Sequence, residues 1–341
     1  MPELRQDPTT KEWVVIAAER AKRPDQFRES TEAISATAAR NDACPFCRGN
    51  EHLTPAEVYA VRDMGASDKS GWRVRVIPNK FAAFLPKDRD KPRGPVVFFN
   101  SQEGFGYHEV IIETPHHDRS MPLMREGEID EVLKAYCERC SALRKDSRVK
   151  LVLIFRNHGH HAGTSLEHPH SQLVGTPIIP FHIRQKYEIA IQHYDDTGRC
   201  LYCDVVDHEK QDGRRVIFET PRFLVFHPFA SRVPFETWIA PKHHNPCFAH
   251  MRGEERLELA VVLHRVLRGL YEALQNPDFN LIIHTAPIED ENKPYFLWHI
   301  EVWPRLTTRA GFELGTGIYI NTEVPEQTAE FMRDEIKRGA K

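Results

Sequence analysis

The chain repeats itself, and this repeat constrains the fold more than any other feature of its 341 residues. HEVIIETPHH at residues 108–117 corresponds to FETWIAPKHH at 235–244. One helical run starts at residue 126 and another at residue 253, and their separation is almost the same as that between the two HH-ending segments. A β-rich stretch and a strand that carries histidine follow each run. Because order and spacing agree over consecutive elements, we expect two copies of one α+β unit.

We predict an α+β fold of two tandem repeats, residues 1–180 and residues 181–341, that pack as a pseudo-dimer within one chain. Each repeat should hold an antiparallel sheet and one long amphipathic helix. No run of about 18 apolar residues occurs and the N-terminus has no apolar signal-peptide region, so we expect a cytoplasmic protein without a membrane partner. The formal net charge of −3 comes from mixed acidic and basic residues, which argues against nucleic acid as a partner.

Two C-x-x-C pairs, one in each half, offer ligands for metal ions. Cys44 and Cys47 present two thiolates at the spacing that zinc uses, and a structural zinc site needs four nitrogen or sulfur ligands. His117 and His168 are the candidates for the other two, since each lies at the end of a repeated element. His116 could replace its neighbour. We predict a zinc site formed by this first set.

The second half carries the same ligand types. The corresponding set consists of Cys200, Cys203, His244 and His299, with His243 as the alternative to His244. The same ligand types at equivalent positions of a repeat are better evidence than a lone C-x-x-C. We therefore predict a second metal site, for which zinc is the expected ion.

A third cysteine pair, Cys137 and Cys140, lies within the first helical run. Residues three apart share one face of a helix, and Leu263 and Val266 stand near the equivalent positions of the second half. Apolar counterparts indicate a packed face, on which free cysteine behaves as a small hydrophobic residue. We predict that this pair belongs to the core and binds no metal.

The segment GTSLEHPHSQ at 163–172 combines a predicted metal ligand with a candidate nucleophile. If His168 binds metal, His170 is free to face a cleft. Neutral imidazole is available near pH 7 and is a good nucleophile toward phosphorus. Backbone N–H groups, a hydroxyl and a side-chain amide surround it, as a phosphate site requires, and they belong to Gly163, Thr164, Ser165 and Gln172.

The corresponding strand of the second half differs at the nucleophile. His299 keeps the presumed ligand position, and Glu301 stands where His170 would be. A repeat that keeps a ligand but lacks the nucleophile is expected to be structural. We therefore predict a single active site per chain.

Four motifs give the chain a resemblance to a known family. With HPHSQ at 168–172, NHGHHAGTS at 157–165, RAKRPDQF at 20–27 and VRVIPNKFAAF at 74–84, it resembles the galactose-1-phosphate uridylyltransferases. These are the transferase branch of the histidine-triad superfamily. The resemblance extends from about residue 3 to GFELGTGIYIN at the C-terminal end and implies two histidine-triad-like repeats.

The resemblance implies a ping-pong reaction between a nucleotide sugar and a sugar 1-phosphate. His170 would attack the α-phosphorus of UDP-glucose, and galactose-1-phosphate would then take the uridylyl group from the histidine. Gln172 would hydrogen-bond the phosphoryl oxygens, and the first cysteine and histidine set matches zinc ligands. The other matched positions are Asn157, Gly163 and Ser165 at the phosphates, Asn79 near the nucleoside, Glu313 at the hexose hydroxyls, and Arg20 and Arg23, which would reach the nucleotide from the partner subunit of a homodimer.

Departures from the family pattern leave the acceptor open. Tyr319 stands where enterobacterial-type enzymes carry a glutamine near the sugar phosphate, and Glu301 and the region near Lys186 reproduce their histidine-rich iron site poorly. The second cysteine pair and GFELGTGIYIN also resemble the ADP-glucose phosphorylase branch, which transfers adenylyl to inorganic phosphate. Pro169, between the two histidines, is typical of the uridylyltransferases. The nucleobase, the acceptor and the ion of the second metal site therefore stay open.

Two further alternatives are weaker. A histidine-triad hydrolase would use water to release the nucleotide, but Gln172 in place of a third histidine favours transfer. A zinc-bearing binding module without activity would leave the phosphate-binding groups of 163–172 unexplained.

Overall fold

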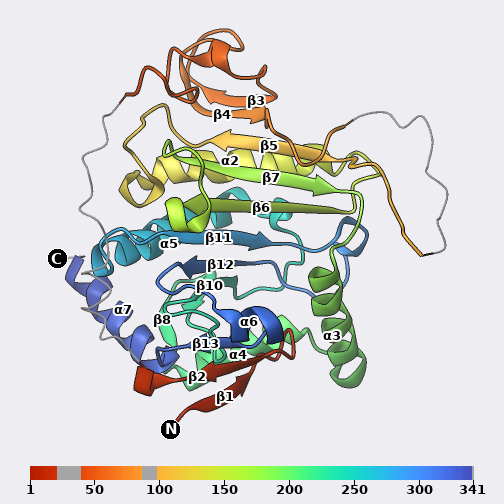
Figure 1. Cartoon of the computed structure of the whole chain (residues 1–341), viewed down its shortest axis with the longest axis vertical. Helices are drawn as coiled ribbons and strands as arrows, with labels where there is room; N and C mark the ends of the chain where they lie inside the picture. The colour runs from red at the N-terminus through yellow and green to blue at the C-terminus, as the bar shows by residue number, and fades with distance from the viewer. Residues whose placement is uncertain (21–39, 87–97, 340–341) are drawn as a thin grey trace.

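The two repeats form one continuous sheet. In the computed structural model, which describes residues 1–20, 40–86 and 98–339, ten strands run in the order β3-β4-β5-β7-β6-β11-β12-β10-β9-β8 (Figure 1). The first five belong to the first repeat and the last five to the second. At the centre, β6 (Leu151–His158) pairs antiparallel with β11 (Phe279–His284), which joins the halves.

The order of elements within each half confirms the predicted repeat and the α+β class. Each half has three strands, one long helix and two further strands. In the first half these are β3 (Tyr59–Arg62), β4 (Trp72–Pro78), β5 (Tyr107–Ile112), α2 (Glu126–Leu143), β6 and β7 (His170–Thr176). In the second they are β8 (Val216–Glu219), β9 (Phe223–Phe226), β10 (Thr237–Pro241), α5 (Gly253–Ala273), β11 and β12 (His299–Pro304).

The main core lies between the sheet and the helices α2 and α5, which pack against each other. Side chains alternate between the two faces of a strand, so Leu173 enters this core while His170 and Gln172 point to the opposite face. Cys140 is fully buried in this core and Cys137 packs against it, as their apolar counterparts predicted. The strand alternation thus places the candidate nucleophile on the face away from the long helices.

Elements outside the repeat lie along the second half (Figure 1). A three-stranded sheet joins β1 (Glu3–Gln6), β2 (Trp13–Ile16) and β13 (Tyr319–Asn321), and β13 runs parallel to β2. The N-terminal strands therefore pair with a segment near the C-terminus rather than with their own half. The remaining helices are α3 (Phe181–Thr197), α4 (Leu201–Asp212), α6 (Gly311–Thr316) and α7 (Pro325–Gly339). Within the described ranges, no helix has both the length and the apolar character needed to cross a bilayer.

Candidate active site

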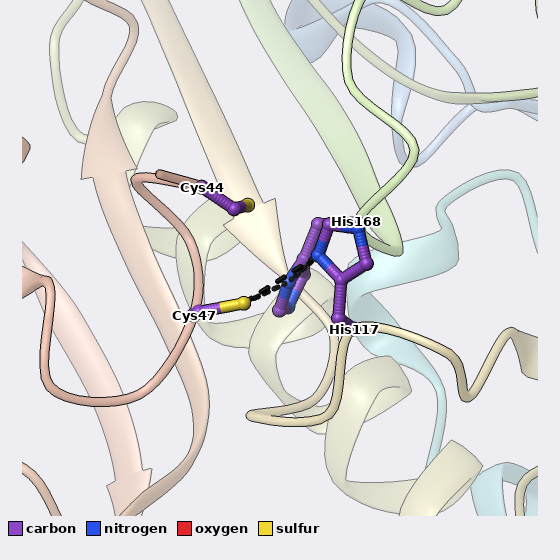
Figure 2. Close-up of side chains that lie close together, drawn as sticks. All are labelled: Cys44, Cys47, His117 and His168. Atoms are coloured by element: carbon purple, nitrogen blue, oxygen red, sulfur yellow. Dashed lines mark hydrogen bonds between the residues drawn. The ribbon is translucent and has the colours of Figure 1, made fainter. Parts of the chain in front are cut away.

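The first predicted ligand set is brought together in the fold. Cys44, Cys47, His117 and His168 are all buried, and their ligand atoms lie within 4.8 Å of one another (Figure 2). Cys47 Sγ is 3.4 Å from His117 Nδ1 and 3.6 Å from His168 Nδ1. Four ligands around a zinc ion at ordinary bond lengths lie about 3.3–3.8 Å apart. The group can therefore hold a metal ion of this kind.

The proton positions of His168 suit a metal ligand. Its Nε2 donates to the Thr114 carbonyl at 2.8 Å, so Nδ1 keeps its lone pair toward the two cysteines. Burial lowers the pKa of His168 to about 4, so the ring is neutral near pH 7. His116, the alternative to His117, is exposed and lies outside the group.

His170 is held in the opposite tautomer. It is the first residue of β7, and its Nδ1 donates to the carbonyl of His168 at 2.8 Å. With the proton on Nδ1, the lone pair is on Nε2. Burial lowers the pKa of His170, which favours the neutral ring that a nucleophile needs.

A cavity of about 610 Å³ lies in front of this residue. Of the predicted phosphate contacts, Asn157, Thr164 and Ser165 line it together with His170. Asn157 Oδ1 accepts a hydrogen bond from Asn280 Nδ2 at 2.8 Å, so a residue of the second half orients this amide. The cavity therefore contains groups that can bind an anion, arranged around the candidate nucleophile.

The end of β6 and the loop beyond it are held by residues of the second half that the sequence did not single out. The 3-10 turn η4 (His160–Ala162) is tied to Asp278, which accepts from the backbone N–H of His161 at 2.6 Å and from its ring at 2.9 Å. His158 donates to Asn276 at 2.8 Å and stacks on Phe279. The run NPDFN at 276–280, with polar residues at alternate positions before a strand, is the sequence signal that marks these contacts.

Two other predicted residues lie farther along the same sheet face. Gln172 and Asn79 both contact Nε2 of His108, a residue that the sequence did not single out. Gln172 Oε1 is 2.7 Å from His108 Nε2, and Asn79 Nδ2 is 3.1 Å from the same nitrogen. Asn79, Gln172 and Gly163 are not among the described residues that line the cavity.

The predicted sugar contacts, Glu313 and Tyr319, lie elsewhere in the subunit. Glu313, in α6, accepts hydrogen bonds from the backbone N–H groups of Ala310 and Ile320 at 3.0 and 3.2 Å. Tyr319 lies in β13, with the Arg309 guanidinium 4.4 Å from the centre of its ring. Arg20 ends the 3-10 turn η1 (Ala18–Arg20), which follows β2, and Arg23 lies outside the described residues. Neither Glu313 nor Tyr319 is among the described residues that line the His170 cavity.

The second cysteine set is brought together in part. Cys200, Cys203 and His244 form a group, with Cys203 Sγ 3.4 Å from His244 Nδ1. Hydrogen bonds with Cys203 and His244 lower the pKa of Cys200 to about 5, which favours the thiolate. His299 is not in this group, and the cysteines lie at the start of α4 rather than in a loop. The group can hold a metal ion with three of the four predicted ligands.

The structure shifts the predicted alignment of the last strand of the second half on that of the first half by two residues. His299 is the first residue of β12, as His170 is of β7, and its Nδ1 contacts the carbonyl two residues earlier, Leu297, at 3.0 Å. His299 therefore corresponds to His170 rather than to His168, and Glu301 corresponds to Gln172. The two-residue period of a strand hides such a shift, because either alignment keeps the same face inward.

Glu301 and its neighbours form a buried ion-pair network. Its carboxylate lies 3.2 Å from Lys186 Nζ and from His284 Nε2, and 3.6 Å from Arg232 Nη1. Burial alone would raise the pKa of Glu301, but Lys186 and His284 hold it well below its usual range. Although His284, His299 and Glu301 are close enough to share an ion, two protein cations already neutralise the carboxylate. The sequence already matches the family's iron site poorly here, and Lys186 and Arg232 lie beside the carboxylate that would have to bind the ion.

Known proteins of similar sequence and structure fall in one group. Residues 1–180 match the family described as galactose-1-phosphate uridyl transferase, N-terminal domain, and residues 108–340 match a domain of unknown function. ADP-glucose phosphorylase of Arabidopsis thaliana is 32% identical over 98% of this chain and 93% of that protein. Galactose-1-phosphate uridylyltransferase of Thermotoga maritima is 31% identical over 98% of each. A crystal structure of the Arabidopsis phosphorylase with bound ADP-glucose matches with a TM-score of 0.82 at 31% identity, covering 98% of this chain and 99% of that one.

Proposed function

Since this chain belongs to the galactose-1-phosphate uridylyltransferase family, we propose that it transfers the uridylyl group of UDP-glucose to a hexose 1-phosphate, galactose-1-phosphate in the first instance. The observation that carries the proposal is the hydrogen bond from His170 Nδ1 to the His168 carbonyl. It leaves Nε2 of a buried, neutral imidazole as the nucleophile at a cavity lined by groups that can bind phosphate.

The reaction proceeds in two displacements at one phosphorus. His170 Nε2 attacks the α-phosphorus, and the bond to the bridging oxygen breaks, so glucose-1-phosphate leaves with that oxygen. A phosphate oxygen of the hexose 1-phosphate then attacks the same phosphorus, and the bond to nitrogen breaks. Between the two steps the imidazole carries a positive charge, which the His168 carbonyl stabilises by accepting the Nδ1–H hydrogen bond.

Asn157, Thr164 and Ser165, which line the cavity, would bind the phosphate oxygens. Gln172 would donate from its side-chain amide as charge develops on the transferred group. Donors of this kind stabilise a transition state by about 3–4 kcal/mol each. Asn79, which like Gln172 contacts Nε2 of His108, would lie toward the nucleoside.

Zinc is the ion we propose for the group of Cys44, Cys47, His117 and His168. Two thiolates and two imidazoles form a common tetrahedral set for zinc, and four protein ligands leave no open position for substrate. When bound, the ion fixes the ring of His168. Because the carbonyl of that residue orients His170, the metal group supports the nucleophile without taking part in the chemistry.

We further propose that the active protein is a homodimer. Glu313 and Tyr319 lie near β13, which pairs with β2, and Arg20 follows β2. Glu313, Tyr319 and the backbone at Arg20 therefore belong to one region, and neither Glu313 nor Tyr319 is among the described residues that line the His170 cavity. A partner subunit that presents this region to the cavity would complete the site.

A second candidate function is ADP-glucose phosphorylase activity. It is favoured by the 32% identity to the Arabidopsis enzyme and by the group of Cys200, Cys203 and His244. The same histidine would take the adenylyl group from ADP-glucose, and inorganic phosphate would remove it. The two candidates differ in nucleobase and acceptor but use the same nucleophile.

One experiment separates these candidates. The full-length protein is incubated with UDP-glucose or ADP-glucose labelled in the α-phosphate, and the covalent intermediate is trapped by rapid denaturation. Labelling by UDP-glucose, discharged by galactose-1-phosphate, supports the first function, and labelling by ADP-glucose, discharged by phosphate, supports the second. His170→Asn should take up no label while its circular dichroism and zinc content remain those of the wild type. Undiminished labelling of this variant would refute the proposed nucleophile.

A further inference from the structure

His108 lies in β5 on the face of the sheet that carries the candidate nucleophile. In the β5–β7 ladder, Ile112 is opposite His170 and Val110 is opposite Gln172. Paired residues of antiparallel strands share a face, and every second residue returns to it. His108 is therefore on the same face as His170 and Gln172, and it is half-buried.

The contacts of His108 determine which of its nitrogens carries the proton. The backbone N–H of Ala83 donates to Nδ1 at 3.1 Å, and a backbone N–H can only donate. Nδ1 must therefore be the acceptor, and the proton of the ring lies on Nε2. Nε2 in turn donates this proton to Gln172 Oε1 at 2.7 Å, the shorter of its two contacts. Asn79 Nδ2 lies 3.1 Å from the same nitrogen, but an amide nitrogen only donates and so cannot accept this proton.

This hydrogen bond fixes the orientation of the Gln172 amide. A glutamine amide has an oxygen that accepts and an NH2 group that donates, and the two differ by a half turn about the last side-chain bond. With the oxygen held by His108, the NH2 group is left to donate on the side away from this ring. In the other orientation the oxygen would face the phosphoryl oxygens and repel them.

We propose that His108 is a positioning residue for nucleotidyl transfer, because its Nε2–H holds the Gln172 amide with the NH2 group toward the phosphoryl oxygens of the group transferred to His170. This inference rests on the proposed function. His108 itself touches neither the substrate nor the reacting atoms; it acts through Gln172.

Two substitutions separate the two contacts of the ring. Asparagine at position 108 can replace Nδ1 but has no donor at the place of Nε2, whereas glutamine can place its amide nitrogen near Nε2. We expect His108→Asn to slow covalent labelling by the nucleotide sugar roughly ten- to hundredfold, because the Gln172 donor is misoriented in part of the molecules. The KM for the nucleotide sugar should change little, since the donor acts mainly on the transition state. His108→Gln should recover most of the rate.

The matched control is His182→Asn, at an exposed histidine of α3. It should label at the wild-type rate. In a Gln172→Ala background, His108→Asn should slow labelling less than about twofold further, since its effect passes through the missing amide. A structural role for His108 would instead give a similar loss in both backgrounds.

A second measurement needs no substrate. The 15N resonances of His108 should show a protonated Nε2 and an unprotonated Nδ1, and Gln172→Ala should make the Nε2 proton exchange faster with solvent. A proton found on Nδ1 would overturn the inference, as would His108→Asn labelling at the wild-type rate. If the wild type takes up label from neither nucleotide sugar, the proposed transfer fails and the role of His108 in it fails with it.

Discussion

At the scale of single residues, the tautomers of the two histidines that flank Pro169 divide the site into two parts. His168 donates from Nε2 to the Thr114 carbonyl and turns Nδ1 to the cysteines, while His170 donates from Nδ1 to the His168 carbonyl. Each tautomer is fixed by a backbone carbonyl, which can only accept. A substitution that keeps a histidine but moves either carbonyl would therefore change the chemistry of the ring.

Gly159 is the residue whose replacement should most directly disturb the cavity loop. Its φ of +84° is unfavourable for other residues, and a Cβ there would overlap the Asp278 carboxylate that ties down His161. Gly159→Ala should lower the free energy of unfolding by about 1–3 kcal/mol and reduce covalent labelling of His170 at least tenfold. Urea unfolding and the trapping assay measure the two effects.

Gly213→Ala is the matched control for this prediction. Gly213 also has a positive φ, +69°, but a Cβ there meets nothing within 4 Å, and the residue caps α4 away from the cavity. Because it has the strained backbone without the overlap, it should lose less stability than Gly159→Ala and keep its labelling rate. Equal labelling by the two variants would contradict the role given to the Asp278 contact.

At the scale of elements, the sequence predicted the order of strands and helices because their hydrophobic periods recur in both halves. It also predicted that Cys137 and Cys140 lie in the core, and it selected the four residues of the first cysteine and histidine group. These features depend on local pattern or on ligand chemistry, both of which are visible in a single sequence.

Other features depend on contacts that no local pattern contains. The register of β12 against β11 places His299 beside His284 and near Glu301. The alignment of the two repeats by sequence was wrong by two residues in this strand, so it could not reveal this cluster. The ties of Asp278 to the η4 loop join the two halves across the central β6–β11 pair. Which nitrogen of His108 carries the proton follows from an Ala83 contact that only the fold creates.

The two cysteine groups should differ in metal affinity. Cys44 and its partners provide four buried ligands, whereas Cys200, Cys203 and the exposed His244 provide three. Cys44→Ser should remove one equivalent of zinc per chain and lower the Tm by roughly 5 °C or more, since structural zinc binding contributes several kcal/mol. A chelator should remove metal from the Cys200 group at lower concentration, because fewer and more exposed ligands hold it.

Elemental analysis and thermal unfolding of Cys44→Ser, Cys200→Ser and Cys137→Ser measure this difference. Cys137 lies in α2 and packs against the core, so its variant is the control and should keep the wild-type metal content. Unchanged zinc in Cys44→Ser would refute the first metal site. Unchanged metal in Cys200→Ser would show that the second group holds no ion.

At the scale of the whole molecule, the continuous sheet makes the two halves interdependent. Asn280, Asn276 and Asp278 of the second half hold Asn157, His158 and the η4 loop of the first. The cavity around His170 is therefore shaped by both repeats, even though the predicted nucleophile and metal ligands come from one. The second half supports the site while its own counterpart residues form an ion-pair network.

Glu313 lies outside the His170 cavity of its own subunit, and this position gives a test of the proposed dimer. If the region around β13 completes the cavity of the partner, two variants that are each inactive should complement each other when mixed. His170→Asn lacks the nucleophile, and Glu313→Ala lacks the proposed hexose contact. In a mixed dimer, one site takes its histidine from the Glu313→Ala subunit and its glutamate from the His170→Asn subunit, so that site is intact.

Co-expression of the two variants with different affinity tags, followed by sequential purification, yields the mixed dimer alone. It should regain about half of the wild-type transfer rate, because one of its two sites has both residues. If Glu313 instead served the cavity of its own subunit, each site would lack one residue and the mixed dimer would be as inactive as its parents. A monomer in sedimentation at assay concentrations would likewise refute the shared site. The outcome decides whether the surface that carries α6 and β13 belongs to the site of its own chain or to that of the partner.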